Sequence, residues 1–591
     1  MKFSNTLLLA SLAIVSLSAF AEEQSPIIVT ATRTAQSVDS TLASVTVITK
    51  EQIQRQQAND LLDVLSSLAG IDMANSGGFG KATNLYMRGT NTGHVLVMID
   101  GVQVGSATLG QAAYQDIPVD LIERIEIVRG ARASLYGSEA IGGVIQIFTR
   151  QPTNTTKLNF SSSTGSYNTK KSTAGISGKF HKTSFSVQAS AFSTDGYNAK
   201  QNNNPDIDGY KQDSANLFIK HEFNNTDSIE LSALHSTNVN QYDSTTKTAN
   251  YYSEGLQQVA GLKGTFNATP GWLITLKANQ SKDDSDAFKN TAKTGVFNTK
   301  RDVYTWQNDF STTENNLLTI GVENNDTSVS GTSAYVKKSR NNKALFIQNN
   351  WSKGEHDLLM SLRTDDNESF GKHTTGNIAW GQKIFNDTNL VLSAATAFKA
   401  PSFNDLYYDA FGYKGNQNIL PETSENFEIS LKKKSTQVNI YRTNIKNLIS
   451  WTGLTSPINI GSAKITGIEF LTSVVLGGWD TQLNLSFADP INNADGKILA
   501  NRSRESLRLD FDRAFSNYAL GATIKSQGIR YTSSAPLDSY TLVDLRASYN
   551  INKDWALKGK ISNAFERKYT LNTDYNTPGK SIFVSIHYNG L

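Results

Sequence analysis

The stretch Arg88-Gly-Thr-Asn-Thr-Gly-His-Val-Leu-Val-Met-Ile-Asp-Gly-Val102 joins a glycine-punctuated turn to a short, dense apolar run. The run covers Val95–Ile99, and an Asp-Gly turn follows it directly. An apolar run this short, with turn signals on both sides, indicates a buried strand rather than a helix. The stretch therefore predicts a strand in the core of a compact domain, with a polar turn beside it.

Residues 40–150 mix helical and strand signals, which is typical of an α+β domain. Apolar residues recur at helical spacing over residues 59–68, with Asn59 or Asp60 as the candidate N-cap and Gly70 just past the end. Short β-rich runs surround this helix, at residues 45–48, 125–128 and 144–148.

After Arg150 the pattern is almost wholly β. Apolar and polar residues alternate with a period of two over residues 185–191, 483–487 and 543–549, which places them on opposite faces of each strand. At about 20 residues per strand and connection, this region accommodates about 22 strands. The alternatives are a soluble β array such as a propeller, for which no regular repeat is visible, and a transmembrane barrel wide enough to need a plug.

The composition excludes several classes of protein. No apolar run of about 20 residues follows the N-terminal region, which excludes a helical membrane protein. The formal net charge of +3 gives no sign of nucleic-acid binding. Cysteine is absent from the 591 residues, which excludes disulfides, thiolate chemistry and Cys-ligated metals.

Residues 1–21 have the form of a secretory signal peptide. Lys2 supplies the positive start, residues 7–20 are apolar, and Ala19-Phe-Ala21 forms a small-x-small cleavage site. The alternative is a short N-terminal membrane anchor, for which the apolar core is too short. We therefore expect cleavage near Ala21 and export of a mature chain.

Longer motifs carry a resemblance to a known family. Together with the stretch above, two segments resemble the plug domain of TonB-dependent outer-membrane transporters: Arg124-Ile-Glu-Ile-Val-Arg-Gly130 and Ser134-Leu-Tyr-Gly-Ser-Glu-Ala-Ile-Gly-Gly-Val-Ile-Gln-Ile147. Three more resemble barrel signatures of the same family: Phe398-Lys-Ala-Pro-Ser-Phe-Asn-Asp-Leu406, Asn418-Ile-Leu-Pro-Glu-Thr-Ser424 and Asn563-Ala-Phe-Glu-Arg-Lys-Tyr569. Within the family, the chain is most similar to the cobalamin (vitamin B12) receptors.

The resemblance implies an all-β transmembrane barrel of about 22 antiparallel strands (residues 151–591) with an N-terminal α+β plug domain (residues 40–150) inside its lumen. It implies a monomer in the outer-membrane lipid of a Gram-negative bacterium that actively transports cobalamin or a related corrinoid and is not an enzyme. A siderophore or haem receptor of the same family is the alternative. An outer-membrane barrel enzyme is more distant, because none of the 7 histidines lies in a nucleophile motif.

Residues 22–39 form the expected periplasmic segment, which contains an uncharged, β-prone run. It resembles the TonB box of the family and comprises Ser25, Pro26, Ile27, Ile28, Val29, Thr30, Ala31 and Thr32. Its alternative is an ordinary first strand of the plug. An extended segment can add as a strand to the edge of another protein, and the resemblance names that protein as TonB, driven by the inner-membrane motor of ExbB and ExbD. The chain itself has no GxxxxGK[ST] loop for a nucleotide.

The resemblance also implies ligand contacts in the plug. The positions that would touch cobalamin are Ala82, Asn84, Asn91, Leu109 and Gly110. Asparagine amides can hydrogen-bond the amide-rich edge of a corrinoid, whereas the alternative role of each asparagine is to form a turn.

The segment Asp206-Ile-Asp-Gly209 places two carboxylates one residue apart beside a glycine. This arrangement suits Ca²⁺, and it is also a common solvated turn. The resemblance implies Ca²⁺ in the extracellular loops, with Asn198, Asn204, Asp206, Asp208, Tyr242 and Asp243 as ligands. The family has a further aspartate after the last two positions. Residues 244–253 contain neither Asp nor Glu, so the chain departs from the two-ion pattern.

Overall fold

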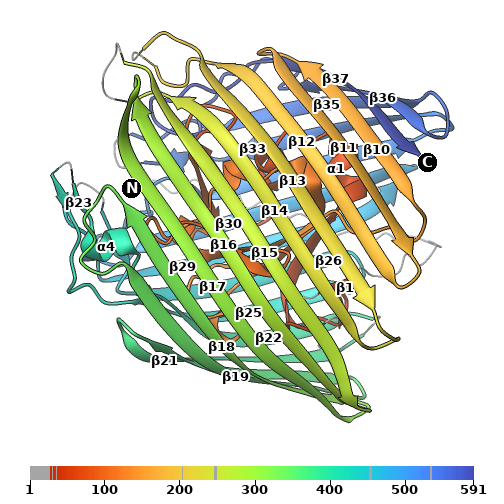
Figure 1. Cartoon of the computed structure of the whole chain (residues 1–591), viewed down its shortest axis with the longest axis vertical. Helices are drawn as coiled ribbons and strands as arrows, with labels where there is room; N and C mark the ends of the chain where they lie inside the picture. Colours follow the sequence, from red (N-terminus) through yellow and green to blue (C-terminus); the bar gives the residue numbers. More distant parts are fainter. Residues whose placement is uncertain are drawn as a thin grey trace, which may run out of the picture.

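The computed structural model describes residues 27–28, 31–34, 36–201, 204–244, 249–385, 387–410, 412–451, 455–532 and 535–590. In this part of the chain, the strands from β10 (Lys157–Gly165) to β37 (Ser581–Gly590) close into one antiparallel barrel. The described residues before β10 form a plug inside the barrel, coloured red to orange in Figure 1. The expected signal peptide lies outside the described residues, and its cleavage remains a prediction.

The barrel has 22 strands, as the alternating pattern predicts. Between β10 and β37 they are β11 (Thr169–Phe180), β12 (Thr183–Tyr197), β13 (Asp208–Glu222), β14 (Ser228–Tyr242), β15 (Tyr251–Thr269), β16 (Trp272–Lys289), β17 (Ala292–Thr313), β18 (Asn316–Gly331), β19 (Ser339–Lys353), β20 (His356–Asn367), β21 (Gly371–Lys383), β22 (Asn389–Lys399), β25 (Glu422–Lys433), β26 (Thr436–Lys446), β29 (Ser462–Leu476), β30 (Trp479–Asn492), β32 (Glu505–Ala514), β33 (Tyr518–Gln527), β35 (Tyr540–Asn550) and β36 (Trp555–Ser562).

Strand β12 shows why this sequence forms a barrel. Ser186 and Gln188 are buried toward the lumen, whereas Val187 between them is 44% exposed on the outside. The outer face is therefore apolar and the inner face polar, as a membrane-spanning barrel requires. Pairing of β37 with β10 closes the ring, so that no strand edge faces lipid.

The two ends of the barrel differ. Short turns join the strands at one end, whereas the connections at the other end carry α4 (Phe403–Tyr407), two small hairpins and a strand pair between two loops. In Figure 1, α4 and β23 lie at the left, and the C-terminus lies at the opposite end. Outer-membrane barrels have short periplasmic turns and longer extracellular loops, which orients this barrel. The hairpins are β23 (Asp409–Ala410) with β24 (Tyr413–Lys414) and β27 (Ile449–Ser450) with β28 (Ile458–Asn459). The pair between two loops is β31 (Arg502–Ser503) with β34 (Arg530–Tyr531).

The plug is an α+β domain around a five-stranded sheet in the order β3-β8-β9-β6-β7. None of the helices that the structure describes is long and apolar enough to cross a membrane. The plug elements are β1 (Ile27–Ile28), β2 (Gln36–Ser37), β3 (Ser44–Thr49), α1 (Lys50–Gln56), α2 (Leu61–Leu65), β4 (Ile71–Asn75), β5 (Thr83–Met87), β6 (Val95–Ile99), β7 (Val102–Val104), β8 (Ile122–Arg129), α3 (Ala133–Tyr136) and β9 (Gly143–Thr149), with 3₁₀ turns at η1 (Thr92–His94), η2 (Tyr114–Asp116) and η3 (Val119–Leu121).

The predicted strand at residues 95–99 is confirmed as β6, and all of its residues are buried. The predicted helix at residues 59–68 is shorter in the structure. Asp60 caps α2 by accepting a hydrogen bond from the Asp63 amide at 2.8 Å, but the helix ends at Leu65. Ser67, two residues later, has a left-handed backbone (φ 59°), which stops the helical path before Gly70.

Candidate ligand vestibule and coupling segment

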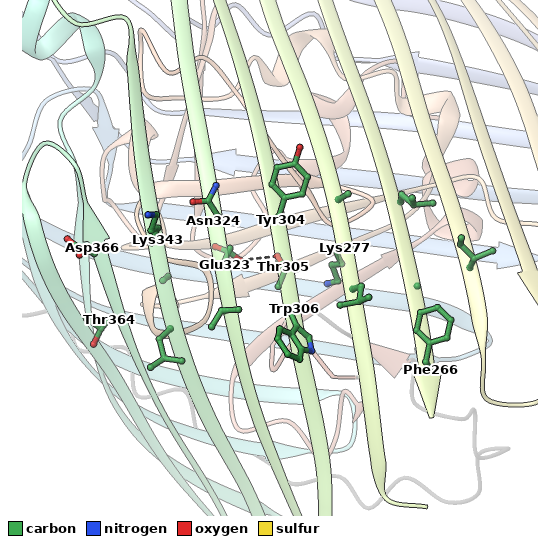
Figure 2. A pocket seen from close by; sticks show the side chains of 18 residues that line it. Phe266, Lys277, Tyr304, Thr305, Trp306, Glu323, Asn324, Lys343, Thr364 and Asp366 are labelled. Atoms are coloured by element: carbon green, nitrogen blue, oxygen red, sulfur yellow. Dashed lines mark hydrogen bonds between the residues drawn. The ribbon is translucent and has the colours of Figure 1, made fainter. Parts of the chain in front are cut away.

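One hollow, of about 1030 Å³, lies on the outer wall of the barrel (Figure 2). Tyr304 and Trp306 on β17 are 55% and 52% exposed there, and Phe266 lies on the same surface. Between them, Thr305 points inward and donates a hydrogen bond to Glu323 at 3.5 Å. Because apolar and aromatic side chains dominate the outward face, this hollow belongs to the lipid-facing surface and not to a ligand path.

A second cavity, of 760 Å³, lies where the plug meets the loop end of the barrel. Its volume is in the range of small-molecule sites. The plug contributes the tip of the β4–β5 hairpin and the segment after β7, and the barrel contributes amides, carboxylates and aromatic rings. The lining includes Lys81, Ala82, Leu109, Asp116, Asn238, Asn240, Tyr242, Gln257, Asp283, Phe297, Tyr408, Trp451 and Tyr575. We call this cavity the vestibule.

The structure places two of the five predicted plug contacts in the vestibule. Ala82 and Leu109 line it, and Leu109 is 62% exposed. Asn84, Asn91 and Gly110 are not among its lining residues. All five positions stay predicted ligand contacts, and the first two lie in the vestibule wall.

The other three positions have partners within the protein. Asn84 pairs with Ala74 inside the β4–β5 hairpin. Arg502 of the barrel donates to the Asn91 side-chain oxygen, and Lys399 donates to the Gly110 carbonyl at 2.9 Å. Cations of the barrel wall, 411 and 289 residues away in sequence, thus bind the Asn91 side chain and the Gly110 carbonyl.

Gln257 of β15 is a site residue that sequence reasoning missed. It lines the vestibule and is only 4% exposed. Among the described residues, neither atom of its amide has a hydrogen-bond partner. A buried amide without partners is costly, so Gln257 is suited to bind a ligand. No sequence signal distinguishes it, because every second residue of a barrel strand is polar.

Three of the six predicted metal ligands form a cluster beside the vestibule. The carboxylates of Asp206, Asp208 and Asp243 offer oxygen atoms within 4.8 Å of one another. The Ala199 amide donates to Asp208 at 2.8 Å, and the Lys200 amide donates to Asp243 at 3.0 Å. Burial raises the pKa of Asp243, and the Asp206 charge adds to that shift. This acidic cluster fits one hard cation.

The other predicted metal ligands have different surroundings. The Asn198 side-chain oxygen accepts the Lys200 amide at 3.0 Å. The Tyr242 ring lies 5.9 Å from the Tyr251 ring and lines the vestibule. Asn204 is half-buried, in the connection between β12 and β13. The described residues therefore bring together carboxylates for one ion and not for two.

The structure describes residues 27–28 and 31–32 of the predicted box. Ile27 and Ile28 pair with Ser37 and Gln36 as a small antiparallel ladder. Ala31 and Thr32 are buried. The remaining predicted box residues Ser25, Pro26, Val29 and Thr30 lie outside the described residues.

Two barrel contacts hold the chain directly after the box. Gln348 donates to the Thr32 carbonyl at 2.9 Å. Arg33 forms an ion pair with Glu323 at 3.0 Å and lies over the rings of Tyr136 and Phe346. Both partners of the ion pair are largely buried. The end of the box is thus attached to β18 and β19 in this state.

Arg88, from the turn that precedes β6, joins the plug to barrel strands β25 and β29. Its guanidinium donates to Glu428 at 2.8 Å and to Glu469 at 2.7 and 2.8 Å. It also lies 4.2 Å from the centre of the Tyr441 ring. All three charged groups are almost fully buried. The polar turn of the opening stretch therefore fixes the plug to the barrel.

Comparison with known families agrees with this architecture. Residues 37–144 match the family described as "TonB-dependent Receptor Plug Domain", and residues 146–564 match "TonB dependent receptor-like, beta-barrel". The chain belongs to the TonB-dependent receptor family. It is therefore a Gram-negative outer-membrane protein of TonB-dependent transport, and the family implies interaction with TonB.

The receptor is similar in sequence to curated proteins and in fold to solved structures. It is 32% identical to the "Vitamin B12 transporter BtuB" of Photobacterium profundum, over 99% of each chain, and 31% identical to that of Vibrio vulnificus, over 95% of each. Among solved structures, a mutant of the ferric enterobactin receptor PfeA of Pseudomonas aeruginosa superposes with a TM-score of 0.79. That match covers 95% of this receptor and 100% of PfeA at 18% identity, and it shows the fold alone.

Proposed function

We propose that this receptor binds cobalamin or a related corrinoid in the vestibule and passes it to the periplasm when TonB pulls on the box. The observation that carries the proposal is the vestibule itself, which combines side-chain amides, carboxylates and aromatic rings at the plug tip. A corrinoid presents amide groups at its edge and a broad face, which such a lining can hydrogen-bond and contact. The relatives of similar length are named as vitamin B12 transporters, which supports the same choice.

The geometry suggests the order in which the plug is disturbed. Tension on the box reaches Thr32 and Arg33 first, because they are the nearest residues attached to the barrel. The next attachment is Lys432, which donates to the carbonyls of Thr41 and Ala43. Strand β3 follows, and it pairs only with β8 in the plug sheet. We propose that pulling detaches this N-terminal edge of the plug before the segments that Arg88 holds.

Cyanocobalamin should bind the purified receptor at micromolar or lower concentration, whereas haem and ferric enterobactin should not. Equilibrium binding measured by tryptophan fluorescence checks this choice. Binding of ferric enterobactin without binding of cyanocobalamin would assign the receptor to the siderophore branch instead.

Replacing Gln257 with alanine should raise the Kd for cyanocobalamin about tenfold, the equivalent of ~1.4 kcal/mol. The reason is that the amide faces the vestibule and has no partner among the described residues. The matched control is Gln258→Ala, because Gln258 bonds His235 on the other face of the same strand. Equal effects of the two changes would show that the loss comes from strand distortion and not from the vestibule.

We also propose that the acidic cluster takes one Ca²⁺, with Asp206, Asp208 and Asp243 as its carboxylate ligands. Asp206→Asn should then weaken Ca²⁺ binding about tenfold, because it removes one of three charges. Calorimetric titration of the purified receptor with Ca²⁺ alone measures it. Coupling through ExbB and ExbD and a monomeric state complete the proposal, and chemical crosslinking in whole cells tests both.

A further inference from the structure

The tip of the β4–β5 hairpin carries a buried ammonium group. Lys81 is only 2% exposed, and its Nζ donates to the Asn240 side chain at 2.9 Å and to the carbonyls of Phe79, Asp208 and Gly209 at 3.1 to 3.3 Å. Three protons thus face four oxygens, most of them from the barrel. A buried charge is tolerated only when it is compensated in this way. The lysine occupies an oxygen cage of the kind that a hard cation prefers.

The same cage adjoins the acidic cluster. Two of the carbonyls that accept hydrogen bonds from Lys81 belong to Asp208 and to the residue that follows it. Burial lowers the pKa of Lys81 to about 8, and the charges of Asp208, Asp116 and Asp243 act in the opposite direction. All four oxygens around Nζ are hydrogen-bond acceptors, which suits a charged ammonium group beside the cluster.

The backbone around Lys81 is held in place independently of its charge. Gly80 has a left-handed backbone, and a Cβ there would overlap the ring of Tyr210. A Cβ on Gly77 would overlap Ala199 in the same manner. Phe79 lies 5.2 Å from the ring of Phe192. These contacts seat the hairpin tip against β12 and β13, so Lys81 reaches its cage without a large entropic cost.

We propose that Lys81 is a tethered cation for the acidic cluster, which neutralises it from the plug side and competes with free Ca²⁺. It thereby joins the plug tip to the extracellular ends of β13 and β14 without a second metal ion. The absence of a carboxylate in residues 244–253 fits this role, since fewer negative charges are left for metal. The role of Lys81 in the vestibule rests on the proposed function, whereas its competition with Ca²⁺ does not.

Under this proposal Lys81 is a positioning residue, and its positive charge should lower the affinity of the acidic cluster for Ca²⁺. In the wild-type receptor, Ca²⁺ should bind weakly, and EDTA should change the Kd for cyanocobalamin less than about threefold. Removal of the ammonium charge leaves three carboxylates without their tethered cation. Free Ca²⁺ should then bind more tightly, and the vestibule should depend on it.

The decisive experiment is calorimetric titration of the purified full-length receptor and its Lys81→Gln variant with Ca²⁺ alone. The variant should bind Ca²⁺ at least about tenfold more tightly than wild type. In EDTA it should bind cyanocobalamin at least about tenfold more weakly, and millimolar Ca²⁺ should restore this binding. Lys81→Arg should resemble wild type in EDTA, because it keeps the charge.

Lys200→Gln is the matched control. Its ammonium lies 5.5 Å from the Tyr575 ring, next to the cluster, and removing it changes the net charge equally. It should alter Ca²⁺ affinity much less than Lys81→Gln. Heat-modifiable mobility on gels verifies that each barrel is folded. In the double variant Lys81→Gln/Asp243→Asn, the gain in Ca²⁺ affinity should disappear, because a negative charge is removed with the positive one.

Unchanged Ca²⁺ affinity in a folded Lys81→Gln variant would overturn the proposal. Loss of cyanocobalamin binding by the wild-type receptor in EDTA, with recovery in Ca²⁺, would also overturn it. A free ion, and not Lys81, would then neutralise the acidic cluster. If wild type binds no cyanocobalamin under any condition, the proposed ligand fails, but the Ca²⁺ titrations still test the tethered cation.

Discussion

Ile28→Pro is expected to abolish uptake of the ligand while its binding at the cell surface stays unchanged. Ile28 lies in the box and already has an extended backbone, paired with Gln36. An extended segment binds a partner edge through main-chain hydrogen bonds, and proline removes one donor from that ladder. Transport of radiolabelled cyanocobalamin into cells, compared with binding to isolated outer membranes, measures the two steps separately.

The control for this prediction is Ile28→Ala, which changes the side chain and keeps the amide. It should retain most of the uptake, and Val29→Pro should fail as Ile28→Pro does. Normal uptake in both proline variants would show that residues 25–32 are an ordinary plug strand and that coupling occurs elsewhere.

Arg88→Leu is expected to loosen the plug inside an intact barrel. The change leaves the carboxylates of Glu428 and Glu469 buried without their cation. Breaking one side of a buried ionic cluster typically costs about 3–5 kcal/mol. The plug should therefore open more often, which ion conductance in planar bilayers and entry of large antibiotics into cells would detect.

Arg55→Ala is the comparison for Arg88→Leu. Arg55 also joins plug to barrel, through Asp480 at 2.8 Å, but both side chains are substantially exposed. An exposed pair contributes only about 0–1 kcal/mol, so conductance should barely change. Combining Arg88→Leu with Glu428→Leu and Glu469→Leu should restore part of the closed state, because it removes the two unpaired carboxylates. The restoration should be incomplete, because buried Arg129 and Arg132 then lose the negative charges beside them. Unchanged ion conductance and antibiotic entry in the Arg88→Leu variant would show that other contacts hold the plug.

Short-range sequence patterns were sufficient to predict strands β6 and β12. The apolar run at residues 95–99 and the turns around it predicted β6 correctly, because burial and turn chemistry act within a few residues. Alternation predicted which face of β12 meets lipid, since side chains on a strand alternate by geometry. The helix at residues 59–68 was overestimated because the left-handed turn at Ser67 left no local signal.

Site residues were predictable only in part. Resemblance placed Ala82 and Leu109 in segments that do line the vestibule. It could not show that Arg502 binds the Asn91 side chain, or that Gln257 faces the cavity without a partner. Both facts depend on which barrel strand lies opposite which plug turn.

By itself, the sequence determined the strand periodicity, the change of pattern near residue 150, and the family motifs. The tertiary structure alone decided the charge pairing. Arg88 is 340 and 381 residues from its two carboxylates, and Lys81 is 159 residues from Asn240. Periodicity reports the surroundings of one strand, whereas these pairs form only after 22 strands close around the plug and exclude water from its surface.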